Sequence, residues 1–215
     1  MSYTTLVTNI QNFVEDNSTE LILSIDTIIA QAEEMVFQRL ANLPCFRKIT
    51  TSNLVANKVD YTVASARMIR QVSITDSNGN VIYLDHRVDS YLRDYWPKSA
   101  TTGQPIMYST KNAGNNAEGI LGSGIVITLA PTPSAILAYQ VDFIAPESGL
   151  SSSNSNTWID TNAPAVLLAA ALYETSAFLK AGETLKLYKT QFDEAAQLFV
   201  QEMQRDYAAE YNGGL

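Results

Sequence analysis

Side chains suited to acid–base chemistry are scarce in this sequence. His86 is the only histidine among the 215 residues, and it directly follows Asp85. Consecutive strand residues point to opposite faces, so these two residues cannot form a catalytic dyad if a strand runs through them. A structural histidine at a strand end or turn is therefore favoured. An enzyme that uses carboxylates such as Asp85 and Asp89 remains an alternative, and it would need a cleft that perturbs one of the acids.

The sequence offers no cofactor or metal site that we can assign. Cys45 is the only cysteine, and one cysteine with one histidine provides too few ligands for zinc. The glycines at 119, 122 and 124 lead into an apolar β-type run, whereas phosphate binding by backbone amides needs a helix to start there. Gly182 and the residues after it lack the second glycine and the GK[ST] ending of a nucleotide-binding loop. We therefore predict no catalytic residues, no cofactor and no metal.

Aromatic and basic side chains gather in the middle of the chain instead. Tyr91 and Tyr95 lie on a short predicted helix over residues 88–95 and Trp96 directly follows it, beside Arg87 and Arg93. Tyrosine, tryptophan and arginine are enriched in protein interfaces, so we interpret the cluster as packing or a subunit interface, with a ligand platform as the alternative. The candidate assembly-interface residues, in this cluster and at the C-terminus, are Tyr91, Arg93, Tyr95, Trp96, Tyr207, Tyr211 and Leu215.

Charge is distributed unevenly along the chain. The formal net charge is −8, from 22 acidic and 14 basic residues, which argues against a protein that wraps nucleic acid by neutralising phosphates. Residues 1–46 hold six acids and one base, residues 47–159 eight acids and nine bases, and residues 160–215 eight acids and four bases. No secretory signal opens the sequence, and no apolar run approaches the roughly 20 residues that span a bilayer. We expect a soluble protein made in a cytoplasm, with acidic helical ends.

Apolar periodicity predicts helices at both ends of the chain. Residues 6–14 and 20–43 show amphipathic spacing in the N-terminal part. In the C-terminal part we predict a helix over 162–180, apolar on all sides and therefore buried, and an amphipathic helix over 183–211. Pro164 fits a first helical turn capped by Asn162 or Thr161, and Gly182 fits the left-handed residue that ends the first helix.

Alternation with a period of two predicts strands in the middle of the chain. The expected strands cover residues 59–63, 68–75, 81–85, 105–110, 125–129 and 138–144. The Asn78–Gly79 pair predicts a hairpin between the second and third of them. Two loops, 112–124 and 148–156, are rich in Gly, Ser and Asn, and we expect them to be mobile or ordered only against a partner.

These elements predict an α+β fold in which the N- and C-terminal helices form a helical bundle and a small antiparallel β domain is inserted between them. The expected parts are residues 1–46, the N-terminal helices of the bundle; 47–159, the inserted β domain with its mobile loops; and 160–215, the helical hairpin that completes the bundle.

Four blocks of this sequence, in order, carry a resemblance to one known protein family. Residues 25–40 are similar to the first long helix of that family, and residues 103–108 match its GxPxxY strand entry. Residues 127–133, followed by 139–143, are similar to its LxPxP-to-strand block. The C-terminal spacing of the family is matched by Trp158, Pro164, Leu168, Ala171, Glu174, Ala177, Phe178, Leu179 and Tyr188. From about Asn17 to Ala209 the chain thus resembles the head-to-tail adaptor (connector) proteins of tailed bacteriophages, especially those of short-tailed phages.

The resemblance implies a structural virion protein that is assembled in the cytoplasm of a host bacterium. Copies would form a ring, typically twelvefold, beneath the portal protein at the head-to-tail interface of the virion. The ring would bind a tail or nozzle protein, and genomic DNA would pass through its channel without specific binding. The resemblance implies neither a membrane partner nor catalytic residues.

Two hypotheses follow for an adaptor, and one alternative function stands beside it. Like charge on the helical ends would keep DNA phosphates from sticking in the channel. Residues 207–215, with their aromatic side chains, would dock on the portal or a neighbouring subunit. The alternative function is a β-domain binding module of a tail or fibre component, which would bind a sugar or a surface protein without any portal.

Overall fold

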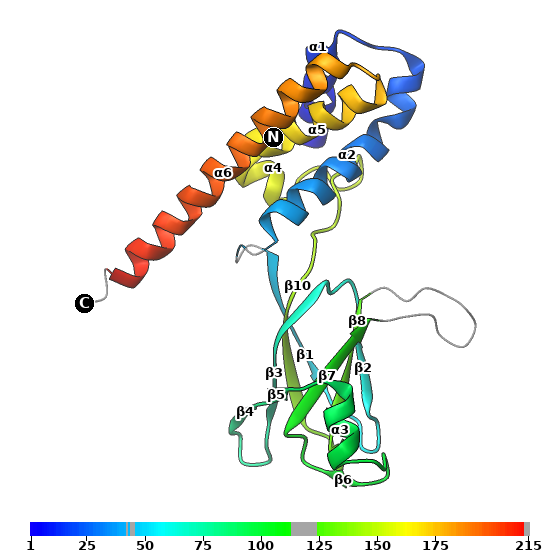
Figure 1. Ribbon diagram of the computed structural model, residues 1–215, viewed down its shortest axis with the longest axis vertical. Coiled ribbons are helices and arrows are strands. Elements are labelled where there is room, and N and C mark those ends of the chain that lie inside the picture. Colours follow the sequence, from blue (N-terminus) through cyan, green and yellow to red (C-terminus); the bar gives the residue numbers. More distant parts are fainter. Residues whose placement is uncertain (42, 44–45, 113–123, 213–215) are drawn as a thin grey trace. The chain divides into compact units, whose positions relative to one another are not determined.

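A computed structural model describes residues 1–41, 43, 46–112 and 124–212, with side chains up to residue 204. The fold is of the mixed α+β class, with antiparallel sheets. The chain divides into two compact units: a helical unit of residues 1–45 and 147–215, and a β unit of residues 46–146. Figure 1 labels the elements of each unit.

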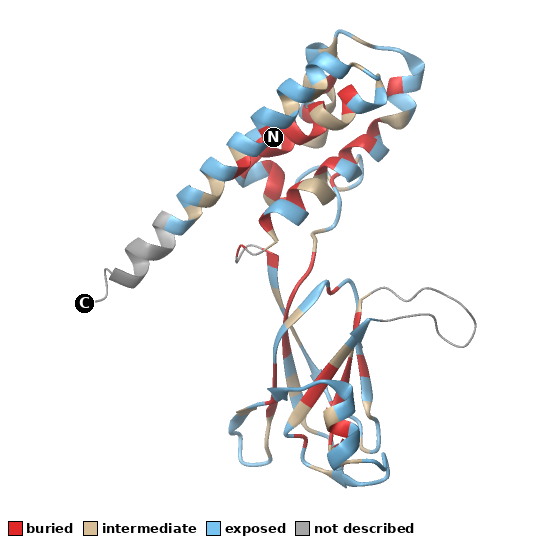
Figure 2. Ribbon diagram, viewed as in Figure 1, coloured by how far each residue is buried: buried red, intermediate tan, exposed pale blue. Residues whose placement is uncertain are grey.

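The helical unit is organised around one apolar helix. Its elements are α1 (Tyr3–Val14), α2 (Thr19–Leu40), α4 (Trp158–Asn162), α5 (Pro164–Phe178) and α6 (Gly182–Asn212). Helix α5 packs against all four others, and eight of its fifteen residues are buried (Figure 2). A helix that is apolar all round needs neighbours on several sides, as its sequence predicts.

Both ends of α5 differ from the sequence-based expectation. Pro164 does occupy the first turn, but Asn162 does not cap it, because residues 158–162 form the separate short helix α4. The side chain of Asn162 donates to the carbonyl of Trp158 at 3.0 Å within that helix. Helix α4 is itself held by a capping box: Asp160 N–H donates to the Thr157 hydroxyl, and Thr157 N–H donates to the Asp160 carboxylate.

The left-handed residue that ends α5 is Lys180, with φ +56°, and not Gly182, which begins α6. The amide of Lys180 donates to the carbonyl of Ala177, and the amide of Ala181 donates to that of Ser176. These two bonds form a Schellman motif, which satisfies carbonyls that the helix end would otherwise leave unpaired. The left-handed residue at the end of α5 therefore lies two positions before Gly182, where the sequence predicted it.

The β unit contains two four-stranded sheets. Its elements are β1 (Arg47–Asn53), β2 (Asp60–Val63), β3 (Met68–Thr75), β4 (Val81–Tyr83), β5 (Asp85–His86), α3 (Asp89–Tyr95), β6 (Thr102–Gly103), β7 (Met107–Asn112), β8 (Ile125–Ala130), β9 (Thr132–Pro133) and β10 (Ala138–Ile144). The strand orders are β1-β10-β3-β4 and β2-β8-β7-β5, and β6 pairs with β9. The β5–β7 and β6–β9 pairs are parallel. The segment that includes α3 connects β5 to β7 as a crossover, which lets these strands run in the same direction.

One apolar core lies between the two large sheets. It combines side chains from β3 and β10 of the first sheet with side chains from β2, β7 and β8 of the second. Val72, Val141 and Ile127 are each at most 1% exposed. The β3–β4 hairpin forms where Asn-Gly predicts it, with Gly79 at φ +84° and the Asp76 amide bonded to the Asn80 carbonyl.

Strand β1 was not predicted from the sequence. Its residues are mostly polar and exposed, so they carry little of the apolar alternation that identifies a half-buried strand. It forms nevertheless, because it pairs along its whole length with β10, from Arg47 opposite Ile144 to Asn53 opposite Ala138. Residues near the two ends of the β unit thus lie on neighbouring strands.

The segment 147–157 belongs to the helical unit and not to the β unit, so the unit boundary lies after Pro146 where the sequence suggested 159. The amide of Leu150 donates to the Glu33 carboxylate of α2, and the amide of Trp158 donates to Glu147. Leu150 itself is buried. The sequence predicted that loop 148–156 is mobile or ordered only against a partner; in the structure it makes its contacts within the helical unit. Of the other predicted mobile loop, residues 113–123 lie outside the described part of the chain.

Candidate assembly surfaces

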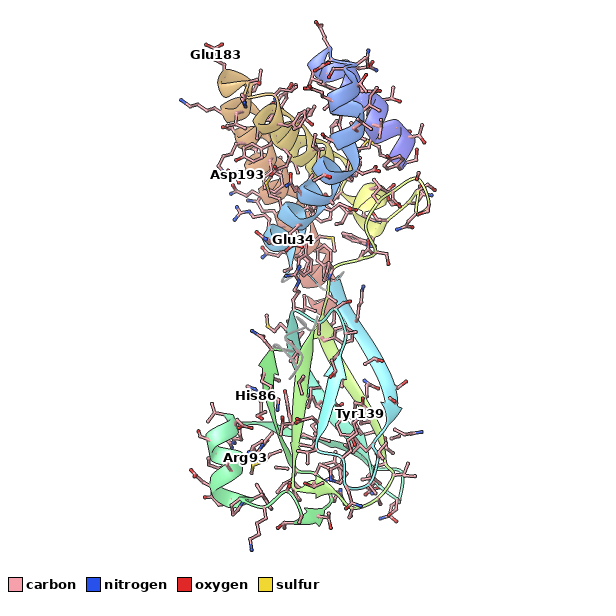
Figure 3. The ribbon with its side chains drawn as sticks, turned by 90° about the vertical axis from the view of Figure 1, so that its right-hand side faces the viewer. Glu34, His86, Arg93, Tyr139, Glu183 and Asp193 are labelled. Carbon is pink, nitrogen blue, oxygen red and sulfur yellow. The ribbon has the colours of Figure 1, made fainter. Side chains whose placement is uncertain are left out.

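The aromatic cluster predicted from the sequence forms one surface of the β unit. Helix α3 packs on β7 through Leu92, which is 3% exposed, and the Ser109 hydroxyl lies 3.3 Å from the Asp89 carboxylate. This anchoring fixes which side of α3 faces away from the sheet. Figure 3 labels Arg93 on α3 and His86 on the neighbouring β5.

The rings of this cluster contact one another. The centroids of Tyr91 and Tyr95 are 4.7 Å apart, and those of Tyr95 and Trp96 are 5.9 Å apart. The Arg87 guanidinium lies 5.5 Å from the Tyr91 ring centroid, which is within cation–π range. A hydrogen bond to Tyr95 raises the pKa of Tyr91. We refer to Arg87, Tyr91, Tyr95 and Trp96 together as the aromatic surface.

The aromatic surface is open to solvent. Tyr95 is 64% exposed. Arg93 is two residues from Tyr91 and Tyr95 and therefore lies on the other side of α3, where its charge helps to lower the pKa of Asp60; half of its side chain is exposed. The ion pair of Arg93 with Asp89, at 3.7 Å, is a surface pair one helical turn apart, so it contributes little to stability. Beside α3, Leu92, Arg93 and Trp96 help to line a cavity of only about 20 Å³. That volume suits a water molecule and no larger ligand.

The three remaining predicted interface residues cannot be assigned to a surface. Tyr207 and Tyr211 belong to the last turns of α6, but their side chains lie outside the described part of the structure, as does the whole of Leu215.

The residues considered for catalysis have separate partners. His86 is exposed on β5, and its Nε2 lies 3.2 Å from the Thr110 hydroxyl. Asp85 pairs with Arg87 at 3.5 Å, and Asp89 pairs with Arg93. Among the described residues, no cluster of three His, Cys, Asp or Glu side chains is arranged to hold a metal ion.

A second surface, which the sequence did not reveal, lies on the helical unit between α2 and α5. This α2/α5 groove has a volume of about 300 Å³, and Leu23, Thr27, Ile28, Gln31, Glu174 and Phe178 are among its lining residues. Leu23 is 80% exposed and Phe178 is 40% exposed. Burial raises the pKa of Glu174. One feature of the sequence could have indicated this groove: Leu23 falls outside the apolar stripe of α2, where a polar residue is expected.

The two units differ strongly in charge. The stretches that form the helical unit contain fifteen acidic and five basic residues, whereas the β unit contains seven acidic and nine basic residues. The helical unit therefore carries most of the negative charge, and the aromatic surface lies on the unit that is slightly positive.

Comparisons with known proteins do not identify this chain: no protein-family model and no curated protein matches it. Among the described helices, none is both long and apolar enough to cross a membrane.

Proposed function

We propose that this chain is a structural virion protein: a head-to-tail adaptor whose copies form a ring, typically twelvefold, under a phage portal protein. The ring links the capsid to the tail or nozzle and lets the genome pass. The observation that carries the proposal is the ordered set of four sequence blocks that resemble this family, from residue 25 to residue 188.

The positions of the blocks in the fold support the proposal. Residues 25–40 are the last 16 of the 22 residues of α2, and residues 103–108 cover the entry into β7. Residues 127–143 run from β8 through β9 to β10, and the last block covers α4, α5 and the start of α6. The first block therefore lies in one helix, the second and third lie in the β unit, and the last covers helices that pack against each other. In the proposed arrangement, the terminal helices form a bundle and the β unit is an insertion in it.

An adaptor needs surfaces for its neighbours and has no substrate to transform. Large apolar side chains are exposed on both units, among them Leu23 and Leu198 on the helices and Tyr83 and Tyr95 on the β unit. Exposed groups of this kind become buried when subunits associate. The acidic helical unit would line or flank the channel, where like charge prevents DNA from adhering.

Electron microscopy of the full-length protein mixed with the portal protein encoded in the same genome tests this proposal. The expected result is a closed ring stacked coaxially on the portal. Scattered monomers beside bare portals would refute it. A filter-binding assay with duplex DNA adds an independent arm: tight, salt-sensitive binding by the ring would refute the proposed role of the acidic surface.

A binding module of a tail or fibre component is the second candidate, and one observation favours it. In the sheet β1-β10-β3-β4, Ile49, Val81 and Tyr83 are 60%, 58% and 62% exposed. Such side chains could hold a sugar ring or a surface protein. Binding to a glycan array, together with failure to associate with a portal, would favour this candidate over the adaptor.

A further inference from the structure

We propose that strand β1 of one copy adds to strand β4 of a second copy, so that one β-sheet continues from subunit to subunit. The inference rests on the proposed ring, for which it names the contact between neighbours. In the strand order β1-β10-β3-β4 these two strands are the edges of one sheet, and Figure 1 labels both. An edge strand presents backbone N–H and C=O groups that a strand of another chain can bond.

The outer edge of β1 carries free backbone groups at alternate residues. In an antiparallel pair, every second residue bonds to the partner strand and the residues between them point the other way. The amide of Leu54 donates to the carbonyl of Leu137, directly opposite it, so the even-numbered residues of β1 bond to β10. The backbone groups of Ile49 and Thr51 therefore point away from β10, toward the free edge.

The outer edge of β4 is free in the same way. The amide of Leu84 donates to the carbonyl of Val72 on β3, so the even-numbered residues of β4 bond to β3. The backbone groups of Val81 and Tyr83 therefore point away from β3. The side chains of Val81, Tyr83 and Ile49 are all exposed, so both free edges offer apolar area for burial.

Strand direction selects a second copy, joined head to tail, as the occupant. The pairs β1–β10, β10–β3 and β3–β4 are all antiparallel, so β1 and β4 run in opposite directions. Two copies that continue one sheet have the same orientation, and β1 of one therefore meets β4 of the next antiparallel. A β1–β1 or β4–β4 contact is two-fold symmetric and stops at a dimer. A β1–β4 contact leaves one free edge at each end, and such contacts form rings when the rotation closes.

One register matches both the backbone and the side chains. It places Ile49 of one copy opposite Tyr83 of the next, and Thr51 opposite Val81. The free backbone groups then face each other in both pairs, and each pair exchanges two hydrogen bonds. A row of directly opposite residues runs across the sheet from Thr51 to Tyr83, so all four side chains lie on one face. Pairs of aromatic and β-branched side chains stabilise neighbouring strands.

The edges of the second sheet are less suited to strand addition. Strand β5 has only two residues. On β2, the amide of Leu129 donates to the carbonyl of Val59, so the backbone groups of Asp60 and Thr62 point to the outer edge. The Asp60 carboxylate, 3.0 Å from the Lys111 ammonium, puts charge at that edge. Short edges and charged edges oppose pairing with another chain.

Disulfide formation tests the contact and its register. In a Cys45→Ser background, chains with Ile49→Cys are mixed with chains with Tyr83→Cys and oxidised, with and without the portal protein. We expect at least tenfold more disulfide-linked pairs than when either kind of chain is oxidised alone, because opposite Cα atoms about 5.5 Å apart suit a disulfide. Chains with Val88→Cys, a site 66% exposed outside β4, replace the Tyr83→Cys chains as the control. Equal yields in the mixed, single-chain and control reactions would overturn the inference.

Hydrogen exchange on the wild-type chain tests whether the backbones pair. The amides of Ile49, Thr51, Val81 and Tyr83 should exchange at least tenfold more slowly in the assembled protein than in the free subunit. The amide of Thr62, at the outer edge of β2, is the control and should keep its rate. Unchanged exchange at the four amides would overturn the inference. So would slowing on β1 alone, since a strand of another protein would then be the occupant.

The outcomes separate this inference from the proposed function. Rings on the portal without the expected disulfides and slowed exchange would overturn the inference and leave the adaptor function standing. Disulfides between the two kinds of chain, with slowed exchange but without a ring on the portal, would keep the strand contact and refute the adaptor function. Absence of both would refute both.

Discussion

The contact between Glu33 and Leu150 predicts how the loop 147–157 is held on the helical unit. Both carboxylate oxygens of Glu33 lie within 3.0 Å of the Leu150 amide nitrogen. A Cβ at Gly149 would lie 3.2 Å from one of these oxygens, so the loop backbone and the carboxylate are in close contact. Replacing Glu33 with alanine leaves the Leu150 amide without its acceptor, whereas glutamine keeps an acceptor and removes the charge.

The size of the effect follows from the lost hydrogen bond. Leaving a partly buried amide without its acceptor destabilises a protein by about 1–3 kcal/mol, so Glu33→Ala should lower the free energy of unfolding by that amount. Glu33→Gln should cost less than ~1 kcal/mol or stabilise. Burial raises the pKa of Glu33 above its ordinary value of 4.5. The hydrogen bond from the Leu150 amide lowers this pKa, whereas the nearby Glu147 and Asp160 carboxylates raise it further. Glutamine removes that repulsion.

The pH dependence has a definite sign. Because the pKa of Glu33 is raised in the folded state, the folded state holds the proton more tightly than the unfolded state does. The stabilisation from this group is full below the unfolded pKa and is lost as pH rises through the folded pKa. The stability of Glu33→Gln relative to the wild type should therefore increase over that window and then level off.

Urea unfolding measured across this pH range, together with hydrogen exchange of the Leu150 amide, checks both parts. A loss of about 1–3 kcal/mol corresponds to exchange about 5- to 150-fold faster in Glu33→Ala. Glu194→Gln, an exposed change on α6, is the control and should alter stability by less than ~0.5 kcal/mol. Equal stability of the alanine and glutamine variants would refute the acceptor role of Glu33.

Three further predictions concern stability and are measured by denaturant unfolding. Gly124→Ala should lower the free energy of unfolding by about 2–4 kcal/mol, because φ is +99° and the new methyl group would collide with the Val63 carbonyl. Gly79→Ala, at φ +84° with open space around it, should lower it by only about 1 kcal/mol, and equal losses in the two variants would contradict this explanation. Leu167→Ala, at a fully buried position of α5, should cost about 2–5 kcal/mol, and a loss no larger than that of the 65%-exposed Leu198→Ala would contradict the assigned core. Thr157→Ala should cost about 1 kcal/mol by removing the cap of α4, and a neutral result would argue against the capping box.

Strong local signals made part of the fold predictable. Strands 68–75 and 138–144 coincide with β3 and β10, in which the core residues Val72, Ile74, Val141 and Phe143 alternate along the chain, although Ser73 and Asp142 between them are buried as well. The Asn-Gly hairpin and Pro164 in a first helical turn also occur as predicted. These features depend on a few neighbouring residues, so the sequence alone identifies them.

Features that depend on partners distant in sequence were missed. Strand β1 is held by pairing with residues more than 80 positions away, and the loop 147–157 by Glu33, more than 110 positions away. Among the candidate site residues, Tyr91, Tyr95 and Trp96 are in contact on α3 and just beyond it, whereas Arg93 lies on the other side of that helix. The α2/α5 groove could not be predicted, since it requires knowing which sides of two separate helices meet.

The pairing of β1 with β10 has a consequence for how this gene can change. Arg47 and Ile144 sit opposite each other, so the chain departs and returns about one interstrand spacing apart, ~4.8 Å. Any module whose two ends lie that close together therefore meets the same geometric condition as residues 46–146, whatever its length.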